Sequence, residues 1–107
     1  MKRTDKPRVI QNYEKLSVEI REQIKLVYPE GYIDNLIEFT NHKGELVSAL
    51  PFETDDKIYM VRMSVRKAQQ LLEIDSDFDD QGNLLDSRKE KFSNKYSDLG
   101  YLFDDDE

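Results

Sequence analysis

The sequence predicts an α+β fold: an N-terminal amphipathic helix, a three-stranded antiparallel β-meander and a C-terminal helix, followed by an acidic, partly disordered tail. Apolar residues first recur at helical spacing. Three segments rich in aromatic and β-branched residues then alternate with polar turns, and a short segment returns to helical spacing. The 107 residues suffice for one domain with a modest core, which six tyrosines and five phenylalanines can help to fill.

The N-terminal part divides into an arm and a helix. Residues 1–8 are rich in lysine and arginine and are expected to form a flexible basic arm. Apolar side chains at spacings of three and four predict a helix over residues 9–28. Alternatively, Ser17 could cap a new helix, which would split this segment into a short helix and a longer one. Pro29 and Gly31 end the segment because neither residue continues a helix.

The middle of the chain predicts three strands joined by two turns. The strands cover residues 32–40, 45–53 and 57–63. The first turn is residues 41–44, where a glycine can adopt a positive φ, and the second is residues 54–56.

Alternation along these strands assigns their side chains to two faces. One face is consistently apolar and is expected to carry the helices; its members are Ile37, Phe39, Val47, Ala49, Tyr59, Val61 and Met63. The opposite face is mixed: Leu36, Glu38, Thr40, Leu46, Ser48, Leu50, Phe52, Ile58, Met60 and Arg62. The mixed face retains more apolar surface than contact with water requires, so it is a candidate binding surface.

Beyond the strands, Ser64 is expected to cap a helix that runs from Val65 to about Ile74. This helix closes a core domain of residues 9–74. Residues 75–107 are predicted to form an acidic appendage, with a marginal helix at residues 84–96.

The charge is concentrated in that appendage. The whole chain carries −7, yet residues 1–72 hold 12 Lys/Arg and 11 Asp/Glu, whereas residues 73–107 hold 4 and 12. The chain has no cysteine, which excludes disulfides and thiolate chemistry and favours a cytoplasmic setting. We expect no secretory signal, because no apolar run follows the basic N-terminus, and no run long enough to span a membrane.

Catalysis is disfavoured. The single histidine, His42, lies in a predicted turn beside Lys43, with no nucleophile placed against it by the local sequence. The four glycines form neither a phosphate loop nor a dinucleotide fingerprint. The sequence therefore predicts a non-catalytic module that has no cofactor and binds another protein. A partner with a basic surface would complement the acidic appendage.

The C-terminal tail is the first candidate site for that partner. It combines three apolar anchors with terminal carboxylates, and the candidate residues are Tyr101, Leu102, Phe103, Asp104, Asp105 and Asp106. The alternative interpretation is a solubilising tail whose aromatic side chains dock on the protein's own body.

Two weaker site hypotheses follow from local composition. A small basic and aromatic patch, comprising Lys57, Tyr59, Arg62, Arg66 and Lys67, could contact nucleic acid, although the net charge repels phosphate. The acidic loop places oxygen ligands at alternate positions, Asp77, Asp79 and Gln81, as calcium loops do. Arg88 stands where such a loop needs a bidentate glutamate, so a metal site is not expected there.

Three segments together resemble a family of small acidic proteins of Bacteroidetes-type bacteria: residues 6–16 (KPRVIQNYEKL), residues 49–54 (ALPFET) and the acidic tail. The resemblance covers nearly the whole chain. It implies a bacterial cytoplasmic origin, and it carries over no activity and no functional residues.

Overall fold

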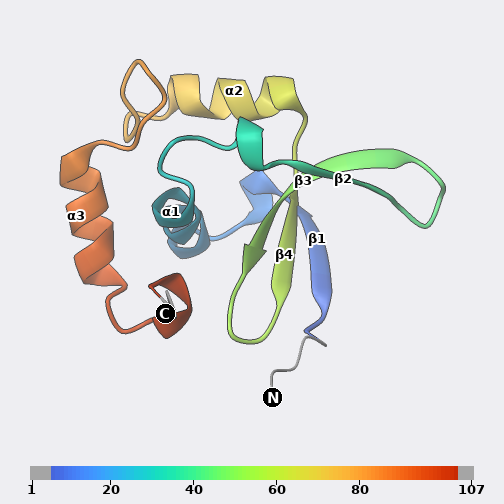
Figure 1. Ribbon diagram of the computed structural model, residues 1–107, viewed down its shortest axis with the longest axis horizontal. Helices are drawn as coiled ribbons and strands as arrows, with labels where there is room; N and C mark the ends of the chain where they lie inside the picture. The colour runs from blue at the N-terminus through green and yellow to red at the C-terminus, as the bar shows by residue number, and fades with distance from the viewer. Residues whose placement is uncertain (1–5, 104–107) are drawn as a thin grey trace.

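The computed structural model describes residues 6–103 and confirms the α+β class (Figure 1). A four-stranded mixed sheet has the order β1-β4-β3-β2, and three α-helices accompany it within these residues. The strands are β1 (Arg8–Asn12), β2 (Ile37–Thr40), β3 (Leu46–Glu53) and β4 (Ile58–Arg62). The helices are α1 (Val18–Val27), α2 (Val65–Ile74) and α3 (Asp86–Lys95).

The predicted continuous N-terminal helix is wrong. Residues 8–12, which include the end of the predicted arm, form β1, an edge strand that pairs in parallel with β4. A 3-10 turn at Tyr13–Lys15 then leads to α1. The alternative start at Ser17 is confirmed, because its side chain accepts a hydrogen bond from the Ile20 amide at 3.2 Å. Pairing with β4 satisfies the backbone of β1, so this tertiary contact outweighs an apolar spacing that also fits a helix.

The meander is correct in outline but incomplete. Strands β2, β3 and β4 are antiparallel as predicted, whereas the parallel β1 makes the sheet four-stranded and mixed. The first strand is shorter than expected because Ile33–Asn35 form a 3-10 turn. The hairpin turn is closed by Asn41, whose Oδ1 accepts hydrogen bonds from the amides of Lys43 and Glu45, and by Gly44, whose φ is +82°.

Pro51 occupies a central strand, which needs explanation because proline lacks an amide proton. The pairing between β2 and β3 ends at Ile37 opposite Ala49, so no strand lies beside Pro51 on that side. Its carbonyl oxygen accepts a hydrogen bond from the Tyr28 hydroxyl instead. The end of α1 thus takes the place that a longer β2 would occupy.

The later helices agree with the sequence. Ser64 caps α2, accepting a hydrogen bond from the Lys67 amide at 3.0 Å, and α2 covers the expected residues. Helix α3 lies inside the marginal segment predicted at residues 84–96. No helix in the described part of the chain combines the length and the apolar character needed to cross a membrane.

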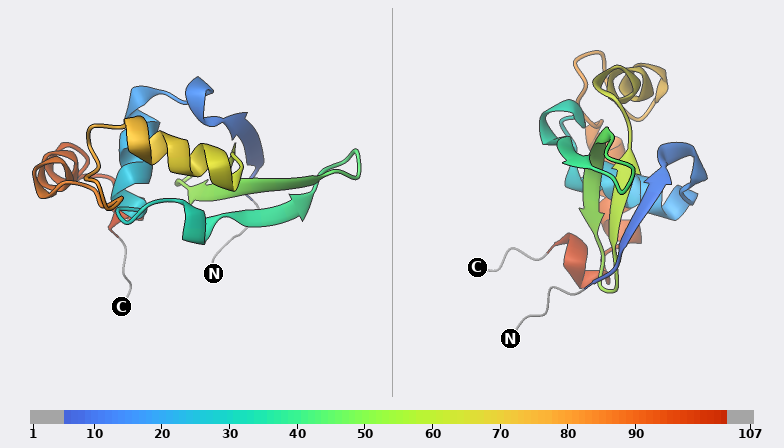
Figure 2. Two further views of the ribbon diagram at one scale, coloured as in Figure 1. Left: turned by 90° about the horizontal axis from the view of Figure 1, so that it is seen from above. Right: turned by 90° about the vertical axis from the view of Figure 1, so that its right-hand side faces the viewer.

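One hydrophobic core joins all of these elements. Ile24 and Tyr32 lie fully buried at its centre beside Leu50 and Val61 of the sheet. The segment predicted to be an appendage contributes to the same core through Phe78, Leu84, Phe92 and Tyr96. Helices α1 and α3 group beside one end of the strands, α2 runs across their top, and the β2–β3 hairpin projects away from the helices (Figures 1 and 2).

Candidate functional site

The register between strands decides which side chains share a face, because residues directly opposite each other point the same way. Leu50 pairs with Val61, and Phe52 pairs with Tyr59. Both pairs belong to the face that carries the core, which we call the covered face.

The other face, here the open face, consists of the alternate residues. Ile10, Met60 and Pro51 form one row across β1, β4 and β3, and the neighbouring rows begin with Arg8 and Asn12. Strand β2 adds Ile37, which lies opposite Ala49, and Phe39, opposite Val47.

The predicted assignment of the faces is therefore wrong across the β3–β4 turn. It grouped Ala49 with Val61, but the structure places Ala49 opposite Arg62 and Leu50 opposite Val61. A one-residue change of register moves a whole strand to the other face. The set Ile37, Phe39, Val47 and Ala49 consequently lies away from the main core.

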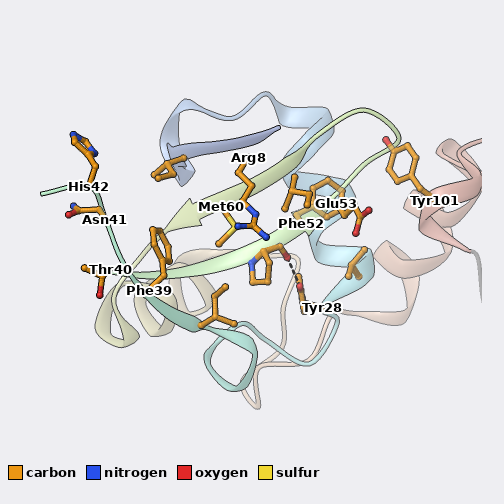
Figure 3. Close-up of a pocket in the computed structure, with 15 residues that line it drawn as sticks. Arg8, Tyr28, Phe39, Thr40, Asn41, His42, Phe52, Glu53, Met60 and Tyr101 are labelled. Atoms are coloured by element: carbon orange, nitrogen blue, oxygen red, sulfur yellow. Dashed lines mark hydrogen bonds between the residues drawn. The ribbon is translucent and has the colours of Figure 1, made fainter. Parts of the chain in front are cut away.

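A groove with a volume of about 940 Å³ crosses the open face (Figure 3). We call it the open-face groove. It receives side chains from all four strands, from the hairpin turn, from the end of α1 and from the C-terminal 3-10 turn. Its lining residues are Arg8, Ile10, Val27, Tyr28, Ile37, Phe39, Thr40, Asn41, His42, Pro51, Phe52, Glu53, Ile58, Met60 and Tyr101.

The floor of the groove is packed, and its sides are open to solvent. Met60 in the floor is 7% exposed, whereas Ile10 is 48%, Ile37 42% and Val27 40% exposed. Single exposed apolar residues are common, but a hollow lined by several of them marks a candidate binding surface. The apolar lining comes from segments far apart in the sequence, which only the folded sheet brings together.

A few polar groups border this apolar surface. The Arg8 side chain lies over the sheet beside Met60 (Figure 3) and forms no ion pair with any of residues 6–103. Glu53 is neutralised by Lys6 at 2.6 Å. Burial raises the pKa of Tyr28, so its hydroxyl keeps its proton and remains the donor to Pro51. Arg8 and Glu53 are the lining residues that carry a formal charge, one of each sign.

The groove offers mainly apolar contacts and a few polar groups. His42 stands at one end of the groove, in the exposed hairpin turn. Residues 6–103 contain no cluster of three or more histidine, aspartate or glutamate side chains suited to hold a metal ion. An apolar groove with a few polar groups at its border can hold an apolar segment of another molecule.

The five residues of the nucleic-acid hypothesis do not form one patch. Tyr59 lies on the covered face, stacked on Phe52 with ring centroids 6.3 Å apart, and the Lys57 ammonium lies 5.6 Å from the centre of the Tyr59 ring. Arg62 belongs to the open face. Arg66 is exposed on α2, and Lys67 of the same helix pairs with Glu14. These five positions therefore lie on different faces of the protein.

The tail residues are divided between the core and the surface. The Tyr101 hydroxyl donates a hydrogen bond to Gln23 at 2.7 Å, and its ring meets the edge of Phe52. Leu102 also packs against the core, whereas Phe103 is 45% exposed. Asp104, Asp105 and Asp106 lie outside the described residues. Tyr101 and Leu102 thus pack on the protein's own body, as the alternative interpretation of the tail states. Tyr101 also closes one end of the open-face groove (Figure 3).

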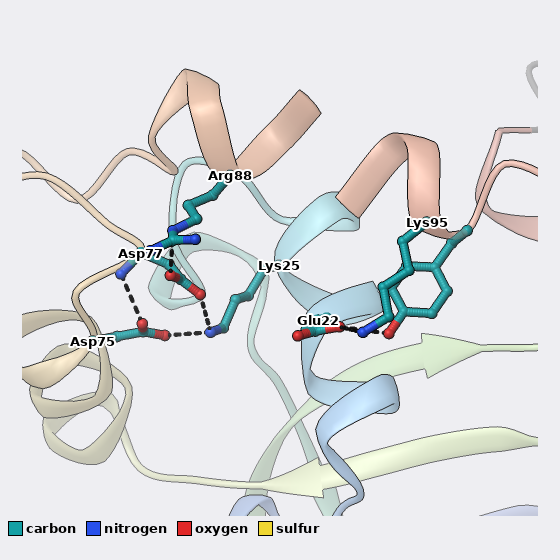
Figure 4. Close-up of polar contacts among 7 residues, drawn as sticks. Glu22, Lys25, Asp75, Asp77, Arg88 and Lys95 are labelled. Carbon is teal, nitrogen blue, oxygen red and sulfur yellow. Dashed lines mark hydrogen bonds and ion pairs between the residues drawn. The ribbon is translucent and has the colours of Figure 1, made fainter. Parts of the chain in front are cut away.

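The residues of the calcium hypothesis are engaged in holding their own loop. The Asp77 carboxylate accepts from Lys25 at 2.8 Å and pairs with Arg88 at 3.0 Å (Figure 4). Asp79 accepts hydrogen bonds from the backbone amides of Gln81 and Asn83, and the Gln81 side chain is exposed. Both carboxylate oxygens of Asp77 and Oδ1 of Asp79 are therefore already bonded to donors of the protein.

Lys25 is the centre of this ion cluster. It is buried, and its ammonium also contacts Asp75 at 2.8 Å (Figure 4). Burial would lower the pKa of Lys25, but the contacts with Asp75 and Asp77 outweigh that effect and raise the pKa. The cluster ties α1 to the segment that precedes α3, and it explains how an acidic segment packs on the core.

No protein-family model, no curated protein and no solved structure matches this chain. The candidate site consequently rests on its own geometry. Arg8 and Ile10 are among the lining residues that were not predicted, because both belong to the segment interpreted as an arm and a helix. The pair of β-branched residues Val9 and Ile10 was the signal that could have indicated a strand.

Proposed function

We propose that this protein is a non-catalytic, protein-binding module and that its partner docks in the open-face groove. The observation that carries this proposal is the contrast in coverage of one sheet: helices bury one face, and within residues 6–103 no helix lies over the other. An apolar sheet face is normally covered by another layer of structure. A partner protein can supply that layer.

The C-terminal tail belongs to the same proposal. Tyr101 stands at the end of the groove, and Phe103 is exposed three residues after Gly100, just before the terminal carboxylates. A partner lying in the groove would meet this end of the chain, so the tail can contribute contacts and electrostatic steering. A regulatory role in a bacterial cytoplasm is part of the proposal; the absence of cysteine supports the reducing compartment.

Affinity capture with matched variants tests the proposal. Ile10→Asp and Ile37→Asp place a charge in the groove at positions that are already exposed, and Val65→Asp places one on α2, where Val65 is also exposed. Each protein is used as bait in an extract of the cell that produces it, with quantitative mass spectrometry as the readout. We expect proteins that wild type and Val65→Asp both retain and that the two groove variants lose.

Two controls make the result decisive. Circular dichroism and thermal unfolding must show that the groove variants remain folded, so that lost binding is not lost structure. Capture that is equal for all four baits would contradict the proposal, because the groove would then contribute nothing to partner binding.

A further inference from the structure

Resting on the proposed function, we propose that the partner places an extended peptide segment beside β1, where the segment pairs with the free edge of the sheet and continues the open-face groove. This names the kind of contact that the partner makes: a fifth strand with an apolar side chain on its groove side. The free backbone groups of β1, the unbroken length of this edge and the exposure of Ile10 support it.

Strand β1 lies at the border of the sheet. The strand order places β4 on one side of β1, and within residues 6–103 no strand lies on its other side (Figure 1). All five residues of β1 are in continuous register with β4, and Pro7 lies before the strand and not inside it. β1 thus lacks the bulge and the internal proline by which many proteins prevent an edge strand from pairing further.

The direction of the backbone groups follows from one hydrogen bond. The Ile58 amide donates to the Pro7 carbonyl at 2.9 Å, so Pro7 faces β4. Along a parallel pair of strands, successive residues direct their backbone groups to opposite sides. Arg8, Ile10 and Asn12 therefore direct their amides away from β4, and no group of residues 6–103 accepts a hydrogen bond from these three amides.

These free groups match an extended chain. The N–H and C=O groups of Arg8 and Ile10 and the N–H of Asn12 face outward, whereas the Asn12 carbonyl begins the following 3-10 turn. The outward residues are about 6.6 Å apart along the strand, and a second extended chain presents its donors and acceptors at the same interval. A helix uses its backbone groups internally, so it cannot pair with this edge.

The side chain of Ile10 extends the argument to the groove. Ile10 lines the open-face groove and is 48% exposed. A residue directly opposite Ile10 in an added strand would lie on the same face, about 5 Å away. An apolar side chain at that place would bury the free flank of Ile10 and extend the row of Ile10, Met60 and Pro51 by one strand.

The other edge of the sheet is shorter. The Asn41 amide donates to the Glu45 carbonyl at 2.9 Å, so alternation in β2 directs the backbone groups of Glu38 and Thr40 away from β3. β2 has four residues and β1 has five. The edge of β2 therefore offers fewer outward groups, and it belongs to the hairpin that projects away from the helices (Figures 1 and 2).

A second copy of the chain fits this edge less well than a segment of another protein. Two β1 strands would join two chains that each carry −7, through five residues of each chain. Specific stable interfaces use about 20 to 30 residues on each side. A partner that also lies in the groove supplies the additional contact area.

A peptide library tests the inference without knowledge of the partner. Random linear peptides of 12 residues, displayed on phage, are selected on the full-length protein, and the selected sequences are synthesised. Amide hydrogen exchange followed by NMR is the structural readout. In the free protein, the amides of Arg8, Ile10 and Asn12 should exchange faster than those of Val9 and Gln11, which face β4. A bound peptide should slow the exchange of the first three amides at least tenfold.

A pair of variants at Asn12 isolates the backbone contribution. Asn12→Pro removes one outward amide and leaves the pairing with β4 intact, and the φ of Asn12, −77°, is close to the value that proline requires. Asn12→Ala is the matched control, because it removes the side chain and keeps the amide. By calorimetry, Asn12→Pro should weaken peptide binding at least fivefold, and Asn12→Ala should leave it unchanged. Circular dichroism must show that both variants are folded; hydrogen exchange of the wild type decides in either case.

Several results would overturn the inference. They are a library that yields no binding peptide, peptides that leave exchange along β1 unchanged or protect Glu38 and Thr40 instead, and equal affinity for Asn12→Pro and wild type. A wild-type dimer that Asn12→Pro dissociates would assign the edge to a second copy.

The capture experiment separates this inference from the proposed function. Partners that the groove variants lose and Asn12→Pro retains would reject the added strand and leave the proposed function standing. Capture that survives in the groove variants would reject the proposed function itself.

Discussion

The two faces of the sheet are built from similar residues and differ in what lies on them. The covered face carries Leu50, Phe52 and Val61, all buried by helices and by the chain that follows them. The open face carries Ile10, Ile37 and Ile58, of which the first two are exposed. Apolar composition therefore does not identify the core of this protein. The core is the face that another element covers, and the register between strands determines which side chains lie on that face.

The covered face obtains its layer partly from the acidic end of the chain. Phe92 and Tyr96 of α3 enter the core, and α3 itself is polar enough to be marginal alone. Ion pairs of Lys25 and Glu22 tie this segment to α1. Three kinds of contact hold this layer on the covered face: core side chains, the ion cluster and a peripheral hydrogen bond. Removing each of them tests the difference between the faces.

Removing a core side chain should have the largest effect. Leu50→Ala leaves a cavity under the helices and should lower the free energy of unfolding by about 3 kcal/mol. Ile10→Ala on the open face, the matched change, should cost well under about 1 kcal/mol because Ile10 is half exposed. Urea unfolding followed by circular dichroism measures both. Similar losses for the two variants would show that the faces contribute equally to stability.

Removing the buried cation should have the next largest effect. Lys25→Met leaves Asp75 without its partner, and Asp77 with only Arg88. Leaving buried carboxylates uncompensated should cost about 2 kcal/mol, since partial exposure of these groups reduces the penalty. Lys91→Met, at an exposed position of α3, should cost almost nothing. Urea unfolding measures the stability of both variants. A Lys25→Met protein as stable as wild type would mean that the ion cluster does not hold the segment before α3 on the core.

Glu22→Gln should have a smaller, pH-dependent effect. The Glu22 carboxylate accepts hydrogen bonds from Lys95 at 2.9 Å and from the Tyr96 hydroxyl (Figure 4). Burial would raise the pKa of Glu22, but these two donors outweigh it and lower the pKa below its usual 4.5. The variant should lose about 1 kcal/mol at pH 7, because one partner is half exposed.

The sign of the pH dependence follows from that lowered pKa. The folded protein binds fewer protons at Glu22 than the unfolded chain, so the stabilisation is complete above pH 4.5 and is lost as the pH falls further. Urea unfolding of wild type and Glu22→Gln from pH 7 to pH 3 should therefore show converging stabilities. A difference that stays constant across this range would contradict the role of the ionised carboxylate.

The sequence could predict the parts of the fold that depend on contacts between residues close together in the chain. Ser64 caps α2 by a bond to its own first turn, and Gly44 closes the hairpin. Each depends on residues a few positions apart. The three antiparallel strands are also neighbours in sequence, so turn chemistry was sufficient to predict them.

The errors share one cause, which is pairing across long sequence distances. β1 was interpreted as helix because its partner β4 lies about fifty residues later. The faces were exchanged because the register of β3 on β4 is set by burial of Leu50 and Phe52, which alternation alone does not reveal. The open-face groove depends both on the pairing of β1 with β4 and on the register of β3 on β4, so it could not be predicted from the sequence. The docking of Tyr101 on the protein's own body was one of the two stated alternatives for the tail.

The smallest effect is expected on the open face, and it sharpens the comparison most. Ile37→Ser removes an apolar side chain that is 42% exposed in the folded protein, at the edge strand β2. The free energy of unfolding should fall by less than about 1 kcal/mol, since a large part of this side chain is already in contact with water. Urea unfolding measures this change, and reduced binding of a hydrophobic dye would show that the exposed patch has shrunk. A loss above about 1.5 kcal/mol would mean that Ile37 supports the fold, and the open face would then be a second core surface and not a site kept for a partner.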